Sequence, residues 1–282
     1  MFLFLYRCIK IMIIFGLAAF SWRVGAVEDE RTYSFAIVPQ QTASELVESW
    51  SPLLSWLTSK TDIQLRFVTA PSIPVFEQRL AQGEYDFAYM NPYHYTVFSQ
   101  KPGYQALIKE KDHRIKGILV TRKDSPIKAL KDLEGKTLVF PSPAAFAASI
   151  LPRAELRKQG ITFMPKYVSS HDSVYINVAK GLYPAGGGIQ RTLELAEESV
   201  RNDLKILWAT QGYTPHAIAA HPRVPTEVAN KFKSAFLQMN EDSEGRKLLD
   251  GISFTRGVAA ATDADWDDVR ALNIGLLDTL LK

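Results

Sequence analysis

Cysteine is almost absent from this sequence of 282 residues, and its single cysteine is Cys8. It lies in an N-terminal segment, residues 1–26, that has the layout of an export signal: Arg7 and Lys10 precede a short apolar run, and small residues lead to a cleavage site after Ala26. The run is shorter than the roughly 20 residues of a membrane span, so an uncleaved anchor is the less favoured alternative. A chain exported to a bacterial periplasm without this leader has no disulfide and no thiolate metal site.

An excess of one charge is also missing once the leader is removed. Arg7, Lys10 and Arg23 are the charged residues of the leader, so residues 27–282 carry 30 basic and 30 acidic side chains. This balance gives no argument for nucleic acid or an anionic membrane surface as a partner. The remaining length suffices for one large or two medium domains.

The common motifs of nucleophilic and metal-dependent enzymes are missing as well. The sequence has no HExxH and no GxSxG, and no cysteine outside the leader. His216 and His221 do not share a helix face and lack a carboxylate partner, so a metal site there is disfavoured. The acidic run 263–268 fits a helix start, and calcium is the lesser alternative. We therefore expect no enzymatic activity, no cofactor and no metal site.

What the sequence does contain is an alternation of short apolar runs with helical stretches. This pattern predicts an α/β fold with mostly parallel sheets and helices on both faces. The predicted strands are 33–38, 63–68, 85–90, 104–109, 116–121, 137–140, 164–168, 204–209 and 217–220. Helices are predicted at 43–57, 75–81, 93–99, 172–180, 225–237, 244–249 and 264–281, and another from residue 191. No Gly/Ser linker separates two domains, so two lobes would be joined by strands crossing near 114–121 and 211–217.

Ligands of open α/β sheets bind beyond the carboxyl ends of the strands, so the residues after each predicted strand are the candidates for a site. They are residues 39–41, 91–95, 141–143, 169–171, 188–190 and 210–213. These segments are rich in amides and hydroxyls, include histidine, and contain no carboxylate. Such a composition suits the binding of a small anion or polar solute better than acid–base catalysis.

The stretch 135–160 predicts a strand, a break at 141–143, and an Ala-rich helix that ends near Gly160. Ser142 is the predicted N-cap, with Pro143 in the first helical position. Free backbone N–H groups and the helix dipole at such an end attract an anion. An ordinary strand-to-helix turn that binds nothing is the alternative.

Several stretches taken together resemble one family, the periplasmic phosphate/phosphite/phosphonate-binding proteins of ABC importers. They are VPQQ at 38–41, YDFAYMNPYHYTVF at 85–98, LEGKTLVFPSPAAFAASILPRAEL at 133–156 and SSHDSVYINVAKG at 169–181. The resemblance covers about residues 32–280. It implies a two-lobed periplasmic-binding-protein fold of the second type that closes on its solute by a hinge. One lobe would hold 27–115 plus 216–282, and the other 116–215.

The resemblance also implies positions for the site. The family's aromatic contact falls on Tyr95, its phosphonate-contacting histidine on His171, and its oxyanion-holding helix N-terminus on residues 144–148. The family's Ser-Thr-Ser-Gly run is replaced there by Ala145, Phe146, Ala147 and Ala148. The missing hydroxyl donors would weaken the binding of a doubly charged ligand unless other groups compensate. The family's acidic ammonium-binding positions have no clear match, so an aminophosphonate is not expected. Phe146 faces either the pocket or the core.

These observations predict a solute-binding protein that captures a small oxyanion for an ABC importer. The alternative is a periplasmic receptor that partners a sensor histidine kinase. The expected partners are a small anion or polar solute and either a transporter permease or that kinase, without nucleic acid and without membrane embedding after leader cleavage. The predicted ligand-binding residues are Gln40, Gln41, Asn91, Tyr93, Tyr95, Ser142, Ala145, Phe146, Ala147, His171 and Gln190.

Overall fold

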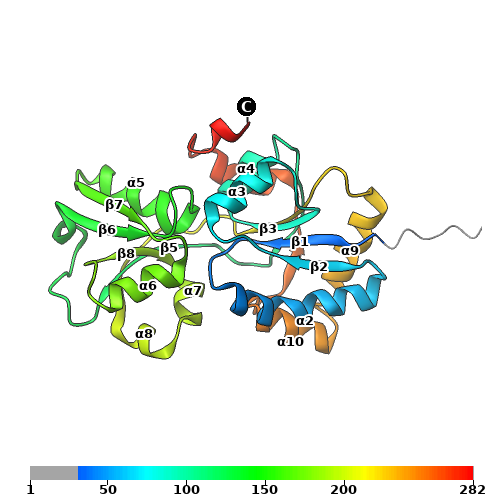
Figure 1. The fold of residues 1–282 in the computed structure, drawn as a ribbon, viewed down its shortest axis with the longest axis horizontal. Coiled ribbons are helices and arrows are strands. Elements are labelled where there is room, and N and C mark those ends of the chain that lie inside the picture. Colours follow the sequence, from blue (N-terminus) through cyan, green and yellow to red (C-terminus); the bar gives the residue numbers. More distant parts are fainter. Residues whose placement is uncertain (1–30, 282) are drawn as a thin grey trace, which may run out of the picture. The chain divides into compact units, whose positions relative to one another are not determined.

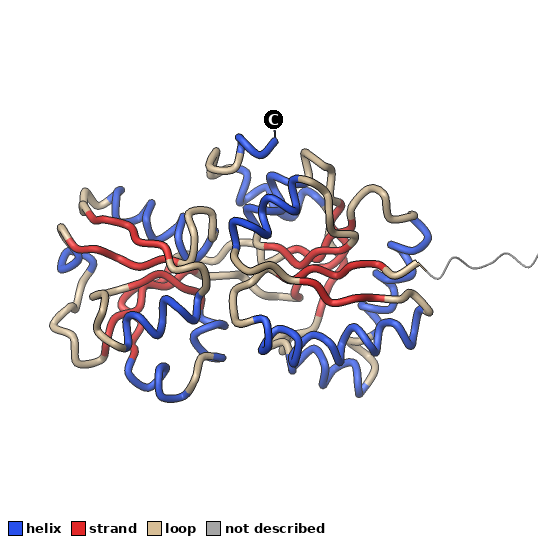
Figure 2. Tube along the Cα trace, in the orientation of Figure 1, coloured by secondary structure: helices blue, strands red, loops and turns tan. Residues whose placement is uncertain are grey.

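The computed structural model describes residues 31–281, and its strands form two separate sheets (Figures 1 and 2). The predicted leader, residues 1–26, lies outside the described residues. Within the described range, no helix combines the length and the hydropathy that a membrane span requires.

The first sheet takes its strands from both ends of the described chain. Its six strands have the order β11-β4-β10-β3-β1-β2. The strand bounds are β1 Tyr33–Ile37, β2 Leu65–Val68, β3 Phe87–Met90, β4 Gln105–Glu110, β10 Ala217–Ala220 and β11 Val258–Ala260. β1 runs parallel to β2 and β3, whereas β10 is antiparallel to β3 and β4, and β11 is antiparallel to β4.

The second sheet is built from the middle of the chain. Its five strands have the order β7-β6-β8-β5-β9. The strand bounds are β5 Gly117–Arg122, β6 Lys136–Phe140, β7 Phe163–Tyr167, β8 Gly186–Ile189 and β9 Leu204–Ala209. β6 is parallel to β7 and β8, and β5 is antiparallel to β8 and β9.

The prediction of mostly parallel sheets is therefore wrong, because both sheets are mixed. The chain passes from one sheet to the other twice, and the two passing segments pair at an antiparallel bridge between Ile115 and Tyr213. β5 and β10 each begin at this crossing, whereas their neighbours β8, β9, β3 and β4 end there. A strand that starts where its neighbours stop must run against them.

Helices cover both faces of each sheet, as predicted. Figure 1 shows α3 and α4 on one side of the first sheet and α2 and α10 on the other, with α5 and α6 on opposite sides of the second. The α-helix bounds are α2 Ala43–Thr61, α3 Ile73–Ala81, α4 Pro92–Phe98, α5 Leu151–Lys158, α6 His171–Ala179, α7 Gln190–Leu195, α8 Glu198–Asp203, α9 Thr226–Gln238, α10 Ser243–Gly251 and α11 Asp267–Arg270. The 3-10 turns are η1 Leu130–Leu133, η3 Asp263–Trp266 and η4 Asp278–Leu281, and η2 Phe146–Ile150 is a π turn.

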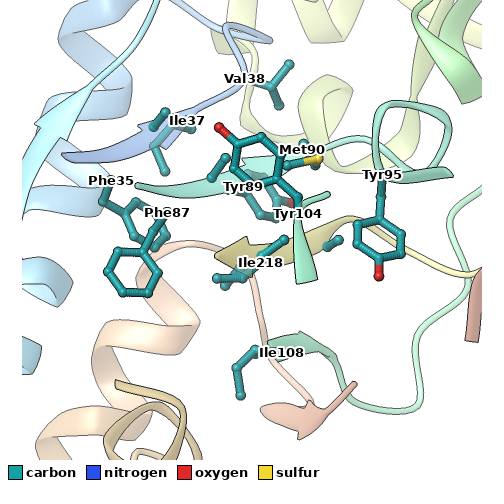
Figure 3. Packing of buried hydrophobic residues seen from close by; sticks show 14 of the residues in the cluster. Phe35, Ile37, Val38, Phe87, Tyr89, Met90, Tyr95, Tyr104, Ile108 and Ile218 are labelled. Atoms are coloured by element: carbon teal, nitrogen blue, oxygen red, sulfur yellow. The ribbon is translucent and has the colours of Figure 1, made fainter. Parts of the chain in front are cut away.

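Aromatic side chains make the core beneath the first sheet. Phe87 on β3 stacks on Phe232 of α9 with ring centroids 4.4 Å apart, and Phe35 on β1 packs against Trp50 of α2 at 5.8 Å. Figure 3 shows Phe35 and Phe87 together, with Tyr89 and Met90 farther along β3. All four residues of β3 are buried, as expected of an apolar strand in the middle of a covered sheet. This core fixes the carboxyl ends of β1 and β3, where the candidate site begins.

Candidate functional site

A small chamber with a mostly buried lining lies between the strand ends of the two sheets. Its volume is about 10 Å³, which is the space of a single water molecule. We call this cavity the chamber. Its lining residues are Val38, Gln40, Ile73, Asn91, Ile115, Ala145, Phe146, Ala147, Ala148, His171, Ile189 and His216. The predicted site residues Gln40, Asn91, Ala145, Phe146, Ala147 and His171 are thus brought together.

The helix that follows β6 starts later than predicted. Its first turn is the π turn η2, which begins at Phe146 and continues into α5, so Ser142 is not the N-cap. Residues 143–145 lie outside the helix, and the Nη2 of Arg153 donates to the Pro143 carbonyl oxygen at 2.7 Å. The Ser142 hydroxyl is buried and has no hydrogen-bond partner in the described part of the chain.

Phe146 belongs both to the core and to the chamber wall. Its side chain is buried and meets the ring of Tyr213 edge to face, with centroids 5.5 Å apart. It also lines the chamber. Phe146 thus faces both the pocket and the core, because the chamber borders the hydrophobic core of the first sheet.

Glycines let the backbone of η2 approach the second sheet closely. A Cβ atom at Gly187 on β8 would lie 1.9 Å from the carbonyl oxygen of Ala148. A Cβ at Gly117 on β5 would lie 1.9 Å from the carbonyl oxygen of Ala147. Real Cβ atoms do not make such contacts, so these two glycines set the position of the chamber wall.

His171 begins α6 and is held by a buried chain of hydroxyl groups. Its Nδ1 lies 2.9 Å from the Oγ1 of Thr192, which lies 2.7 Å from the hydroxyl of Tyr175. The Tyr175 hydroxyl in turn is 2.9 Å from the carbonyl oxygen and 3.1 Å from the amide nitrogen of Ile189. Burial lowers the pKa of His171 to about 3, so the ring is neutral near neutral pH.

His216 is a second buried imidazole in the chamber wall. Its ring stacks on Tyr89 at 4.8 Å, and its Nε2 lies 3.0 Å from the Nε2 of Gln40. The Gln40 amide donates to that ring nitrogen, which leaves the hydrogen on Nδ1. This Nδ1 is buried and has no partner among the described residues. Burial, with the charge on Arg191, lowers the pKa of His216 well below its usual range.

His216 is not among the predicted ligand-binding residues, because those were residues that follow strands. His216 directly precedes β10, an antiparallel strand that begins at this edge. The wrong expectation of parallel strands therefore caused the omission. The one signal in the sequence was the histidine's place within the predicted crossing segment.

Asn91 and Gln40 connect the strand ends of the first sheet to segments of the second. Asn91 caps α4, since its Oδ1 accepts from the His94 amide at 2.8 Å, and its Nδ2 donates to the carbonyl oxygen of Ala144 at 3.3 Å. The backbone amide of His171 donates to the carbonyl oxygen of Gln40 at 3.0 Å. These two contacts link the two sides of the chamber.

The remaining predicted residues lie elsewhere. The Tyr95 hydroxyl donates to Asp263 at 2.8 Å, and the Tyr93 hydroxyl accepts from the amide of Leu277 at 2.9 Å, so both rings point from α4 toward the C-terminal segment. Gln41 lines a separate hollow beside α2. Gln190 donates to Glu194 at 2.7 Å on α7. The structure does not bring these side chains, or Ser142, to the chamber lining.

A wider cleft of about 570 Å³ adjoins the chamber. We call it the cleft. Its lining residues are Glu110, Asp112, His113, Arg114, Ile115, Lys116, Ile189, Gln190, Arg191, Glu194, Pro215, His216, Ser253, Thr255 and Arg256. Arg191 pairs with the buried carboxylate of Glu110 and donates to the Tyr89 hydroxyl at 3.0 Å. Burial raises the pKa of Glu110, and the Arg191 charge opposes that rise.

Comparison with known proteins gives a consistent result. The family model described as "ABC transporter, phosphonate, periplasmic substrate-binding protein" matches residues 35–266. The phosphate-import protein PhnD of Mycolicibacterium smegmatis is 26% identical over 270 residues, which is 85% of this chain and 84% of that protein.

Two solved structures share the fold at low sequence identity. The binding-protein component of an ABC phosphonate transporter from Pseudomonas aeruginosa has a TM-score of 0.80 at 17% identity, covering 87% of this chain and 86% of that one. PhnD1 from Prochlorococcus marinus, solved in complex with methylphosphonate, has a TM-score of 0.78 at 16% identity, covering 87% and 99%.

Proposed function

Because this chain belongs to the family of periplasmic substrate-binding proteins of phosphonate ABC transporters, we propose that it captures a small tetrahedral oxyanion in the chamber and delivers it to an importer. The oxyanion is of the phosphate, phosphite or phosphonate type. A phosphate-import relative and a structural neighbour that holds methylphosphonate support this ligand class. The observation that carries the proposal is the convergence of uncharged donors from both sheets on one buried chamber.

The proposal includes export and two lobes. Residues 1–26 direct the chain to the periplasm and are removed after Ala26, which the periplasmic character of the family supports. Residues 27–115 with 216–282 form one lobe, and 116–215 form the other. The membership of the two sheets and the bridge between Ile115 and Tyr213 support these bounds. The sensor-kinase alternative gains no support, since the relatives described above are transport proteins.

The proposed ligand contacts are the polar and backbone groups of the chamber. Gln40, Asn91 and His171 supply side chains, and residues 145–147 supply the start of the helix. We add His216, whose buried Nδ1–H has no partner among the described residues and lies in the same wall. Tyr93, Tyr95, Ser142, Gln41 and Gln190 are left out of the contact set, because their side chains lie away from the chamber.

Binding requires the two lobes to part and close again. A chamber of about 10 Å³ is too small for a tetrahedral oxyanion, so the ligand enters when the contacts across the chamber break. These contacts are the hydrogen bonds from His171 to Gln40 and from Asn91 to Ala144. The ligand then favours the closed arrangement by binding it more tightly than the open one.

A thermal-shift experiment on the purified protein tests this function. Methylphosphonate, phosphite, phosphate and sulfate serve as probes, and a ligand at about 100 times its dissociation constant adds about 2.7 kcal/mol to the free energy of unfolding. The shift is expected to disappear in His171→Ala and to persist in the matched cleft variant Lys116→Gln. A shift that survives in His171→Ala but is lost in Lys116→Gln would place the ligand in the cleft. The absence of any shift would overturn the proposed function.

A further inference from the structure

The lining of the chamber carries no formal charge. It consists of apolar side chains, the amides of Gln40 and Asn91, and the neutral imidazoles of His171 and His216. The guanidinium group of Arg191 forms an ion pair with the carboxylate of Glu110, and Arg191 does not line the chamber. When an anion moves from water into this chamber, hydrogen bonds are the interactions that offset the free energy of dehydrating its charge. Dehydrating the second charge of a dianion costs far more than dehydrating the first.

The hydroxyl chain behind His171 satisfies its hydrogen bonds in either of two directions. In the first, the Ile189 N–H donates to Tyr175, Tyr175 donates to Thr192, and Thr192 donates to His171 Nδ1, which leaves a hydrogen on Nε2. In the second, His171 Nδ1–H donates to Thr192, Thr192 donates to Tyr175, and Tyr175 donates to the Ile189 carbonyl, which leaves a lone pair on Nε2. The observed distances of 2.7 to 3.1 Å fit both.

His216 differs from His171 because its tautomer is fixed. The Gln40 amide donates to its Nε2, so its buried Nδ1 presents an N–H group, and this ring is 3% exposed. The chamber therefore holds one fixed donor and one ring that presents a donor or an acceptor. A ligand that bears both a charged oxygen and a hydroxyl group satisfies both rings.

We propose that the chamber takes the singly charged, hydroxyl-bearing form of the oxyanion, with His216 donating to a charged oxygen and His171 accepting from the ligand hydroxyl. Thr192 and Tyr175 are positioning residues, which hold the His171 ring in place and satisfy its Nδ1 in the tautomer that the ligand requires. This inference rests on the proposed function and specifies the charge state and the contacts of its ligand.

Methylphosphonate and methanesulfonate form a matched pair of probes. Both are tetrahedral and carry a methyl group, but methylphosphonate gains a second charge as pH rises, whereas methanesulfonate keeps one charge and has no hydroxyl group. Calorimetric titration of the purified protein measures both dissociation constants on either side of the second pKa of methylphosphonate. Above that pKa, the affinity for methylphosphonate is expected to fall about tenfold for each pH unit relative to methanesulfonate.

Protonation of groups on the protein changes the affinity for both probes. Dividing the methylphosphonate affinity by the methanesulfonate affinity at each pH therefore isolates the titration of methylphosphonate. The titratable or charged groups near the two rings are Glu45 on α2, Glu77 on α3, His94 on α4, Glu110, His113, Asp172 on α6 and Arg191 on α7. Below the second pKa, methanesulfonate is expected to bind about tenfold more weakly than methylphosphonate. It has no hydroxyl group to donate to His171, so the hydroxyl chain must reverse and His171 must donate from Nε2 instead. A dianion that binds as tightly as the monoanion, or equal affinity for the two probes, overturns the inference. Failure of both probes to bind at any pH overturns the proposed function instead.

The positioning role has its own test. Thr192→Val removes the hydroxyl group at constant shape. Thr121→Val is the matched control, since Thr121 is also buried in the second sheet and its hydroxyl donates to the Pro184 carbonyl oxygen. We expect about tenfold weaker methylphosphonate binding in Thr192→Val and little change in Thr121→Val. The ¹⁵N spectrum of His171 should show one tautomer in the complex and a mixture in Thr192→Val. A single unchanged tautomer in Thr192→Val would refute the positioning role.

Discussion

The chamber and the cleft share a wall of Ile115, Ile189 and His216, yet their chemistry is opposite. The chamber has a volume of about 10 Å³ and an uncharged lining, and the cleft has about 570 Å³ and both basic and acidic side chains. Water reaches the cleft and solvates its charges, whereas a charge in the chamber would be dehydrated without an opposite partner. Arg191 and Glu110 show the intermediate case, because they are buried together as a pair. The chamber, whose lining is mostly buried, thus holds uncharged polar groups, and the cleft, whose lining is partly exposed, holds charged ones.

The largest expected effect comes from breaking that buried pair. Arg191→Leu leaves the Glu110 carboxylate, whose side chain is 4% exposed, without its cation, and we expect a loss of about 3–5 kcal/mol in the free energy of unfolding. Urea denaturation measures it. Glu110→Gln in the same chain should restore much of the loss, and Lys116→Gln at the open end of the cleft should cost less than about 0.5 kcal/mol. A loss below about 1 kcal/mol in Arg191→Leu would show that the pair is hydrated like the rest of the cleft.

A smaller loss in the free energy of unfolding is expected from a substitution that displaces η2, which forms part of the chamber wall. Gly187→Ala places a methyl group 1.9 Å from the Ala148 carbonyl oxygen, so η2 must shift, and we expect a cost of about 1–3 kcal/mol. Gly251→Ala at the end of α10 is the control, since nothing lies within 4 Å of its Cβ position. Thermal or urea unfolding compares the two. Equal stability of the two variants would mean that η2 does not pack on β8 as described.

Ligand affinity separates the chamber from the cleft most clearly, through a variant of His216. His216→Phe keeps a ring to stack on Tyr89 and removes the Nδ1–H, so the affinity for methylphosphonate should fall about ten- to a hundredfold, as for a lost hydrogen bond to a charged group. Arg256→Gln in the cleft should change the affinity less than about twofold, with an effect that vanishes in salt. Calorimetry at two salt concentrations measures both. A larger loss of affinity in Arg256→Gln than in His216→Phe would place the ligand in the cleft instead of the chamber.

A further expected effect is a pH dependence of stability at Asp172, the residue that follows His171 on α6. Burial, with the Glu45 carboxylate, raises the pKa of Asp172 to about 7, so the folded chain holds a proton there that the unfolded chain releases near pH 4. Stability should therefore fall as pH rises from about 4 to about 7. Asp172→Asn removes that fall: it should be more stable than the parent chain above about pH 7, with no such advantage below about pH 4.

Melting temperature as a function of pH measures the Asp172 effect. Asp62→Asn is the matched control, because the Asp62 side chain is 89% exposed and asparagine tolerates its left-handed backbone. The control should follow the parent curve. Parallel curves for Asp172→Asn and the parent chain would show that Asp172 stays ionised and hydrated in the folded state.

Local elements were predicted well because local patterns decide them. The strands at 204–209 and 217–220 have their predicted bounds, and most helices differ by a few residues. There are two main exceptions. The predicted helix at 264–281 is wrong, since the structure has only the short α11 there, between the 3-10 turns η3 and η4, and the helix after β6 starts later than predicted. The helix after β6 starts at Phe146, and Arg153 donates to the Pro143 carbonyl oxygen that precedes it, a contact that no pattern near Ser142 indicates.

The candidate site was predicted only in part. Gln40, Asn91, His171 and residues 145–147 meet in one chamber, as expected of residues that follow strands. Tyr93 and Tyr95 follow the same strand, but their places on α4 turn them toward Leu277 and Asp263. His216 was missed because it precedes a strand whose direction the sequence did not reveal.

The sequence by itself determined the alternation of strands and helices, the balanced charge without a cysteine in residues 27–282, and a resemblance that the family model bears out. The first two follow from local composition and periodicity, and the resemblance follows from the stretches at 38–41, 85–98, 133–156 and 169–181. Only the tertiary structure decided that β5 and β10 run against their neighbours, that Gly117 and Gly187 admit the backbone of η2, and that His216 and His171 line one chamber. Each of these depends on contacts between residues far apart in the chain, which local sequence does not specify.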